Sequence, residues 1–260
     1  MKKILTLFIA VCLLTSAVFA GGKKEKVVIN SAADLAGKKI GVQAGTTGEM
    51  WVEENVEGAK ISSFKTGIDA ALDLKNGAID AVVLDELPAK EIVSRNKNLT
   101  IVKDNFAREE YAIAVKKGNP ELLDSINKTI ETMKANGDYE KLVNAFMPVD
   151  GKIVIPADKT DSSASKTVKL GTNAAFPPFE YVEGKDVVGF DISMGQRIAA
   201  DYGRKLEVVD MAFDSLIPAL QSGAIDFIAA GMSVTEERKK NVDFSVPYYE
   251  SEQVIIIRKK

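Results

Sequence analysis

The sequence predicts an α/β protein built from two similar lobes. Residues 67–86 (GIDAALDLKNGAIDAVVLDE) and 212–232 (AFDSLIPALQSGAIDFIAAGM) each begin at an Asp helix cap, continue with leucines at helical spacing, and reach Gly-Ala-Ile-Asp before an apolar strand. Residues 38–50 and 168–180 are a second matched pair, each a short apolar strand that ends in a turn of small residues. Strand, turn, helix and strand in each half predict parallel sheets with right-handed crossovers. A chance recurrence within one domain is the alternative, and two matched pairs in the same order argue against it.

The first twenty residues predict a cleavable signal peptide. Lys2 and Lys3 form a basic start, residues 4–14 are apolar, and residues 18–20 (VFA) resemble a cleavage site. An apolar run of about eleven residues is too short for a bilayer, which needs roughly 20, so a membrane anchor is the less favoured alternative. We expect a mature chain that begins near Gly21 and is periplasmic.

Composition excludes several classes of function. Cys12, the only cysteine, lies inside the apolar run and away from the cleavage point, so we expect neither a lipoprotein nor a disulfide. The chain has no histidine, which excludes Ser-His and Cys-His catalysis and removes the commonest transition-metal ligand. A net charge of −3 with scattered basic residues argues against nucleic acid. We therefore expect a monomer with a small-molecule partner and with no metal or organic cofactor.

The two α/β units are separated by a helical segment and a linker. Residues 120–147 predict two helices broken at Asn136 and Gly137. Residues 156–166 (PADKTDSSASK) are polar and almost free of large apolar side chains, which is typical of a linker.

Motifs along nearly the whole mature chain resemble one family, the polar amino-acid solute-binding proteins of bacterial ABC transporters. The motifs are DLAGKKIGVQAGTTGE, AIDAVVLDE, NGDYEKLVNAF, GTNAAFPPFEY, VVGFDISM, FDSLIPALQSGAIDFIAAGMSVTEERKK and VDFSVPYYESEQVIII. The resemblance implies a two-lobed periplasmic-binding-protein fold (type II-like) with a ligand cleft between the lobes. It also implies capture of a free amino acid and its delivery to a membrane permease.

The order of the motifs differs from that of the family, in which the GTNAAFPPFE-type strand begins the mature protein. Moving residues 167–260 in front of residue 26 restores the family order with each element present once. We therefore predict a circularly permuted chain, in which the linker joins the family's two ends; a truncated tandem gene product is the alternative. Lobe two is expected over 26–110 and lobe one over 111–260. Only residues 110–116 are then expected to link the lobes, which would favour a more open ligand-free state.

The resemblance assigns the α-carboxylate of the ligand to Arg238, whose guanidinium fork can make two parallel hydrogen bonds. Gly231 and Ser233 precede it and would add backbone groups and a hydroxyl. Without the resemblance, a solvated charge on a helix is the plainer interpretation of this arginine.

Lobe two is expected to supply the other contacts to the amino-acid backbone. Thr46 and Thr47 lie in a strand-to-helix turn and match carboxylate contacts of the family, where the helix dipole favours an anion. Asp85 follows an apolar strand at its carboxyl end and matches the partner of the α-ammonium group. Ordinary helix capping is the alternative role for the threonine turn. For Asp85 the alternatives are a helix-capping role or Glu86 in its place.

Specificity is expected to depend on the positions around the ligand side chain. Phe176 and Phe213 match the flanking aromatic pair, although an aromatic near a strand end is more often part of the core. Asn173 stands where relatives often carry an acid, Gln43 faces the side chain, and Glu180 is a nearby acid. Two aromatic faces suit a guanidinium, which puts arginine or another basic amino acid slightly ahead of glutamine.

Two other classes compete with a transport role. A cleft enzyme on the same fold, such as a dehydratase, would need a poised acid or base, and no extra catalytic candidate stands out. A ligand sensor would carry a transmembrane helix and a signalling domain, which this sequence does not show. We expect a binding protein and no enzyme.

Overall fold

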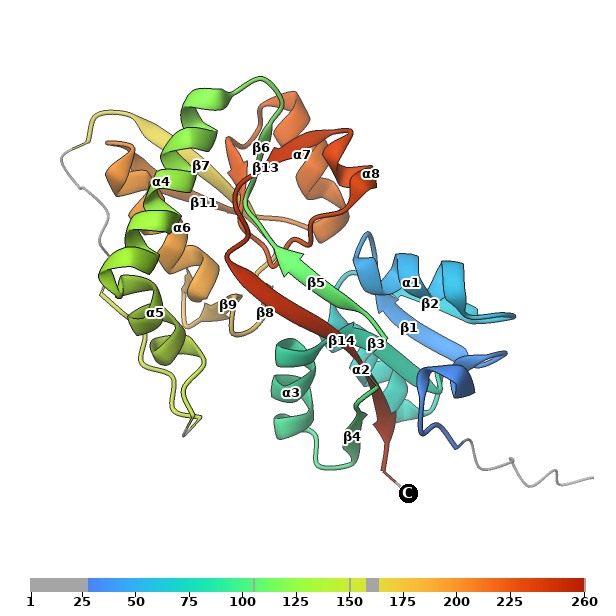
Figure 1. Ribbon diagram of the computed structural model, residues 1–260. Coiled ribbons are helices and arrows are strands. Elements are labelled where there is room, and N and C mark those ends of the chain that lie inside the picture. Colours follow the sequence, from blue (N-terminus) through green and yellow to red (C-terminus); the bar gives the residue numbers. More distant parts are fainter. Residues whose placement is uncertain (1–27, 105, 150, 158–163, 260) are drawn as a thin grey trace, which may run out of the picture.

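The structure is a computed structural model that describes residues 28–104, 106–149, 151–157 and 164–259. The predicted signal peptide and residues 158–163 of the linker lie outside the described residues. Figure 1 shows two lobes joined by a pair of strands that run side by side. Within the described part of the chain, no helix combines the length and apolar character that crossing a membrane requires.

Lobe two is built on a mixed sheet with β1 and β3 at its centre. β1 is parallel to β2 and β3, whereas β14 is antiparallel to β3, β4 and β5. The strand order is β2 (Lys60–Phe64), β1 (Lys39–Gln43), β3 (Ala81–Asp85), β14 (Tyr249–Arg258) and β4 (Leu99–Val102), with β5 (Arg108–Tyr111) beside β14. The helices of this lobe are η1 (Ala32–Leu35), α1 (Thr47–Asn55), α2 (Gly67–Asn76) and α3 (Glu86–Arg95).

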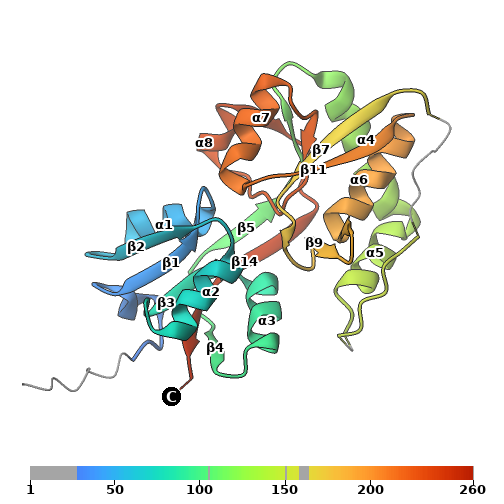
Figure 2. The same cartoon turned by 180° about the vertical axis from the view of Figure 1, so that it is seen from behind.

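Lobe one is built on a second mixed sheet. Its strand order is β11 (Lys205–Asp210), β7 (Thr167–Thr172), β12 (Phe227–Ile228), β6 (Ala114–Lys116) and β13 (Val242–Phe244). A small sheet of β8 (Ala175–Phe176), β9 (Glu180–Glu183) and β10 (Asp186–Val188) lies beside it. Figure 2 shows one group of helices on one side of the main sheet, α4 (Pro120–Asn136), α5 (Asp138–Phe146) and α6 (Phe190–Asp201). The other side carries α7 (Leu216–Ser222) and α8 (Glu236–Lys239). The short helix η2 (Phe213–Ser215) directly precedes α7 in the chain.

The predicted repeat corresponds to α2 and β3 in lobe two and to α7 and β12 in lobe one. Gly77 and Gly223 end the two helices in the left-handed conformation, with φ of 77° and 79°. Ile79 and Ile225 of the two Gly-Ala-Ile-Asp segments are both buried. The predicted break between helices at Asn136 and Gly137 is also present, because α4 ends at Asn136 and Gly137 adopts φ 78°.

Two local expectations are wrong. α2 is capped by Thr66, whose side chain accepts a hydrogen bond from the amide of Asp69, so the acid lies in the first turn and is not the cap. In the second unit Asp214 lies inside η2 and Ser215 occupies the cap position of α7, so an aspartate cap is absent there too. The sheets are mixed rather than parallel, because strands that cross between the lobes enter them in the antiparallel direction. The parallel pairing holds for β2-β1-β3 and for β11-β7-β12.

The lobes are connected by two strands, whereas the sequence predicted one connection over residues 110–116. β5 and β14 pair antiparallel from Tyr111 with Tyr249 to Arg108 with Glu252, and Figure 1 shows both crossing between the lobes. β14 then inserts between β3 and β4, so residues 249–258 join the lobe-two sheet outside the expected range of 26–110. A central strand must be apolar on both faces, and Val254, Ile255 and Ile256 are almost completely buried.

Candidate functional site

A small cavity of about 10 Å³ lies between the two lobes, roughly the room that a single water molecule needs. The structure brings all ten sequence-predicted site residues to the walls of this cavity. They are Gln43, Thr46, Thr47 and Asp85 from lobe two and Asn173, Phe176, Phe213, Gly231, Ser233 and Arg238 from lobe one. Glu180 and Ala230 complete the lining. Most of these residues follow strand ends, where open α/β sheets bind ligands.

Arg238 is a buried cation at the boundary between the lobes, only 4% exposed. Its Nη1 donates to the carbonyl of Ser233 at 2.7 Å and its Nη2 to the carbonyl of Gly45, in the other lobe, at 2.8 Å. The guanidinium lies over the Phe213 ring, 5.3 Å from its centroid. Burial lowers the pKa of Arg238, and a guanidinium has further N–H donors beyond these two. This geometry excludes the solvated helix charge that was the plainer interpretation.

Asp85 is the buried acid that lobe two contributes. It precedes α3 at the cap position, yet its side chain makes no capping hydrogen bond. The hydroxyl of Tyr111 donates to Oδ1 of Asp85, and the hydroxyl of Ser251 lies 3.4 Å from the same atom. Burial, and secondly the negative charge of Glu109, raise the pKa of Asp85 to about 7. A cationic group placed beside this carboxyl would favour its ionised form.

The two threonines of the lobe-two turn have different environments. Thr46 caps α1: its hydroxyl lies 3.4 Å from the amide of Glu49 and donates to the carbonyl of Gln43 at 2.7 Å. Thr47, the first helical residue, donates to Oε2 of Glu109 at 2.8 Å. The capping role that was the alternative therefore holds for the Thr46 side chain, while the start of α1 still faces the cavity with its positive dipole end.

Gln43 and Asn173 link the lobes at the end of the cavity expected to face the ligand side chain. Nε2 of Gln43 donates to Oδ1 of Asn173 at 2.9 Å and to the carbonyl of Lys65 at 3.3 Å. Nδ2 of Asn173 donates to the carbonyl of Met211 at 2.8 Å. The buried Oε1 of Gln43 has no hydrogen-bond partner among the described residues. It is an acceptor that can receive an N–H group of a ligand.

A pair of buried carboxyl groups lies under the lobe-one wall. Burial, followed by the nearby charge of Asp191, raises the pKa of Glu180 well above its usual range. Asp191 accepts from the amide of Gly231 at 2.8 Å and from the hydroxyl of Tyr248 at 2.7 Å, and burial raises its pKa to about 6. The amide of Gly231, expected to face the ligand, is therefore engaged with Asp191. Gly231 has φ 52°, and a Cβ there would lie 2.7 Å from Cε1 of Phe176.

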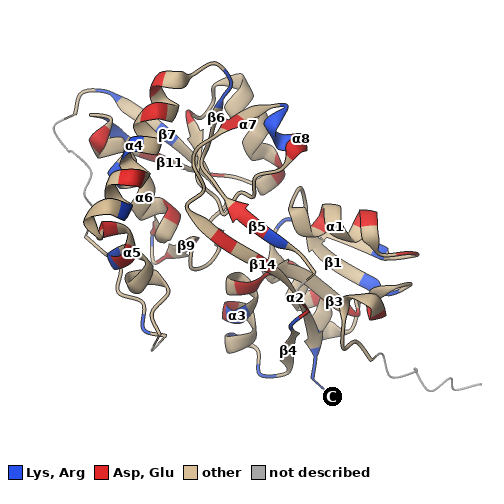
Figure 3. Cartoon of the chain, in the orientation of Figure 1, with Lys and Arg blue, Asp and Glu red and all other residues tan. Residues whose placement is uncertain are grey.

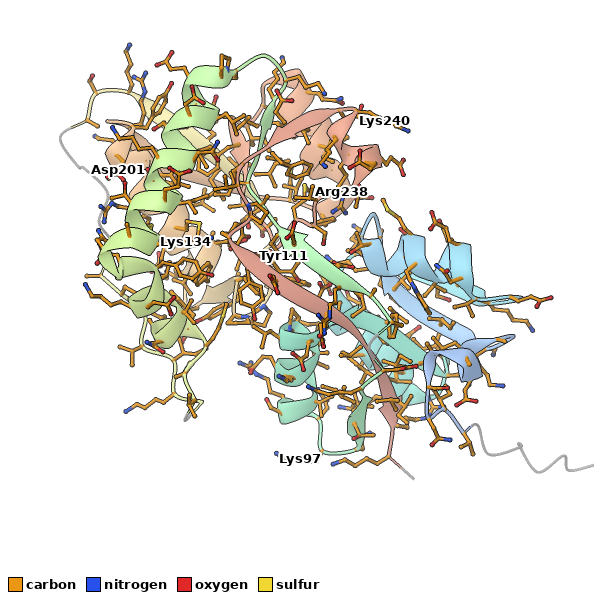
Figure 4. The ribbon with its side chains drawn as sticks, viewed as in Figure 1. Lys97, Tyr111, Lys134, Asp201, Arg238 and Lys240 are labelled. Carbon is orange, nitrogen blue, oxygen red and sulfur yellow. The ribbon has the colours of Figure 1, made fainter. Side chains whose placement is uncertain are left out.

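Glu109 and Tyr111, which both lie on β5, were not among the sequence-predicted site residues. Tyr111 is completely buried and contacts Asp85, and Figure 4 shows it between the lobes near Arg238. Figure 3 shows acidic positions on both β5 and β14, where these two strands pass from one lobe to the other. The segment REEY was treated as a connection only, and alternation along β5 is the signal that could have indicated an inward-facing acid.

The two lobes enclose one cavity, to which one lobe contributes a buried arginine and the other a buried aspartate. This arrangement defines a class, the two-lobed ligand-binding proteins. The family of bacterial extracellular solute-binding proteins, family 3, matches residues 14–149 and 168–260 of this chain. The chain belongs to this family. Membership places it among solute-binding proteins and not among enzymes, as the sequence analysis expected.

Several curated relatives share parts of the sequence. The arginine-binding extracellular protein of Bacillus subtilis (strain 168) is 45% identical over 97 residues, which are 37% of this chain and 38% of the relative. The L-cystine-binding protein of Escherichia coli (strain K12) is 34% identical over 129 residues, 49% of this chain and 48% of the relative. A probable histidine-binding protein of Campylobacter jejuni is 40% identical over 126 residues, 45% and 49% of the two chains. The aligned part of this chain thus spans less than half the length of each relative.

Proposed function

We propose that the protein captures a polar amino acid between its lobes and delivers it to the permease of an ABC transporter, outside the cytoplasmic membrane. One observation carries the proposal: the buried Arg238 of lobe one and the buried Asp85 of lobe two line the same cavity. A free amino acid carries one anionic and one cationic group on a single carbon. A cation on one lobe and an acid on the other fit that pair of charges.

The cavity residues divide between the two charged groups of the ligand. The α-carboxylate binds the guanidinium of Arg238, with the positive end of α1 beside it. The α-ammonium group binds Asp85, which becomes ionised as the cation arrives. Since the two partners lie on different lobes, the ligand makes its full set of contacts only when the lobes are closed, and binding favours closure.

Arginine or another basic amino acid is the favoured ligand, with glutamine second. The rings of Phe176 and Phe213 can flank a guanidinium, a cation-π contact worth roughly 0.5 to 2 kcal/mol. The unpaired Oε1 of Gln43 is an acceptor, and the Glu180 carboxyl can balance a positive charge when ionised. Curated relatives are named as arginine-, histidine- and cystine-binding proteins, which supports this class of ligand.

A thermal-shift screen of the chain from Gly21 against the twenty amino acids, ornithine and citrulline tests the proposal. A ligand that binds only the folded state adds about 2.7 kcal/mol of stability at 100 times its Kd. An upward shift with arginine or glutamine is the expected result. Cooperative melting with no shift for any amino acid would contradict the proposal, and turnover of a bound ligand would favour the enzyme alternative.

We also propose that the order of elements is a circular permutation of the family order. Each curated match follows only part of the chain, as expected when a collinear alignment meets a rearranged order. Ile29 packs in the same apolar cluster as Ile255, so the segments to be rejoined lie close together. A rearranged chain, residues 167–260 followed by 26–156, should fold and bind the same amino acid. Failure of that chain to fold, when the present order folds, would refute the permutation.

A further inference from the structure

One carboxylate outside the cavity lining joins both lobes and both crossing strands. Oε2 of Glu109 accepts from the hydroxyl of Thr47 in lobe two at 2.8 Å and from that of Ser233 in lobe one at 2.5 Å. Its Oε1 accepts from Nε2 of Gln253, on β14, at 3.1 Å. Glu109 itself lies on β5. A single side chain thus connects the two crossing strands and the two walls of the site.

We propose that Glu109 is a positioning residue that holds the lobes closed and sets which hydrogen bonds the Thr47 and Ser233 hydroxyls can offer to the ligand. Part of this inference, the effect on ligand affinity, rests on the proposed function. The other part, the effect on closure, depends only on contacts within the chain.

The closing role follows from where the three bonds are made. Thr47 begins α1, and Ser233 lies in the loop that leads from β12 to α8, so these two hydroxyls come together only when the lobes meet. They lie 3.5 Å apart with the same carboxylate oxygen between them as acceptor. When the lobes separate, Glu109 can remain with one hydroxyl at most. Hydrogen bonds to an ionised group are the stronger kind, so their loss opposes opening.

The orienting role follows from the chemistry of a hydroxyl. Each hydroxyl has one proton and two acceptor lone pairs, and an ionised carboxylate can only accept. Thr47 and Ser233 therefore direct their protons at Glu109 and present lone pairs to the cavity that both residues line. Toward a ligand these hydroxyls act as acceptors for N–H groups. Contacts to the α-carboxylate then fall to Arg238 and to backbone amides, not to the two hydroxyls.

The surrounding charges fit this position. Glu109 is the first among the acids whose charge acts on Arg238 to favour its ionised form, ahead of Asp85. It therefore provides the buried guanidinium with a nearby negative charge while the pKa of Asp85 stands near neutrality. Removing Glu109 would leave the Arg238 charge in a poorly solvated place with less compensation.

Closure can be measured without any ligand by placing spin labels on Lys97→Cys in lobe two and Lys240→Cys in lobe one. Both lysines are exposed, Figure 4 shows them on different lobes, and Cys12 is the only natural cysteine. Distance distributions are compared for the parent, E109A, E109Q and the control E110A. Glu110 is exposed and alternates with Glu109 along β5. The expected result is a loss of the short-distance population in E109A, a smaller loss in E109Q, and none in E110A.

Arginine affinity by calorimetry gives the second readout. We expect E109A to weaken binding by about tenfold, as loss of hydrogen bonds to a charged group would, and E110A to stay within about twofold. Distance distributions and affinity equal to the parent in both Glu109 variants, each folded by circular dichroism, would overturn the inference, as would tighter binding by E109A. If the parent binds no amino acid, the proposed function fails, while the distances still decide the role of Glu109.

Discussion

The same local unit occurs in both lobes and ends in different chemistry. In each lobe a helix ends at a left-handed glycine, Gly77 or Gly223, and Ala-Ile-Asp leads into a buried strand. In lobe two the strand ends at the buried acid Asp85. In lobe one the chain continues to Gly231, whose φ of 52° allows close contact with Phe176, and then to Arg238. The repeated unit supplies the scaffold, and the few residues after each strand determine the charge that the lobe brings to the cavity.

The two lobes differ in the charge that each brings to the cavity, and the largest effect is expected at the buried cation. Arg238→Ala should weaken amino-acid binding at least about 30-fold, because truncating one member of a buried, hydrogen-bonded charge pair costs about 2 to 5 kcal/mol. Isothermal titration calorimetry measures the effect. Lys239→Ala is the matched control, since Lys239 is the exposed neighbour paired with Glu236. Equal losses in the two variants would mean that Arg238 does not contact the ligand.

The acid of lobe two should have the next largest effect and a distinct pH dependence. Asp85→Asn should weaken binding about ten- to one-hundredfold through loss of a charge-assisted hydrogen bond. Because the pKa of Asp85 is about 7, parent affinity should rise as pH increases from about 5.5 to 7.5 and then level off. The Asn variant should lose most of this rise, with a residual slope near pH 6 from Asp191. A parent affinity that does not change with pH would contradict the assignment.

The same carboxyl should affect stability with the opposite sign. Its pKa is raised by folding from 3.8 to about 7, so between these values the unfolded chain releases a proton that the folded chain retains. The free energy of unfolding of the ligand-free protein therefore falls as pH increases from about 4 to 7 and is flat with respect to this group above 7. Urea unfolding of Asp85→Asn should show a shallower decline over this window. A decline identical to that of the parent would argue against the burial of Asp85.

Glycines in the two lobes differ in whether an added side chain would meet a neighbouring residue. Gly231→Ala should destabilise the protein by about 2 to 3 kcal/mol, because a positive φ costs about 1 to 2 kcal/mol and the new Cβ would lie 2.7 Å from Phe176. Urea denaturation measures the change in the free energy of unfolding, with the slope of that free energy against urea concentration equal in the two proteins. If Gly231→Ala lowers the free energy of unfolding by less than an alanine substitution at an unobstructed helix-end glycine does, the Phe176 ring moves aside freely.

The smallest effects on stability are expected at the two helix-end glycines, and they should be equal in the two lobes. Gly77→Ala and Gly223→Ala place a side chain at φ 77° and 79° with no atom within 4 Å of the new Cβ. Each should cost about 1 kcal/mol, with the two values equal within error. A clear difference between them in the same denaturation assay would show that the two repeats are not energetically equivalent.

The candidate site was predictable because its residues lie next to local signals. Arg238, Asp85 and the threonine turn each stand immediately after a strand or at the start of a helix, so the resemblance could be carried over position by position. Glu109 was not predictable in this way, since its role depends on three partners that are 62, 124 and 144 residues away in sequence.

The second crossing strand was missed for a similar reason. The apolar run of β14 predicts a buried strand, but no local pattern tells which of two sheets will take it. Its pairing with β3 and β4 is a long-range choice. Which residue caps α2 was also misassigned, because Thr66 and Asp69 are both good capping residues and only the backbone conformation separates them.

The paired crossing strands also determine how the lobes can move. Two strands hydrogen-bonded side by side form a ribbon, and sliding one strand past the other would break the pairing from Tyr111 with Tyr249 to Arg108 with Glu252. Bending across the ribbon keeps those bonds. The lobes can therefore swing toward each other about the ribbon far more easily than they can move in other directions. With the function proposed above, Arg238 and Asp85 then return to the same relative position on every closure, and the ligand meets one preset distance between its two charged partners instead of a range of distances.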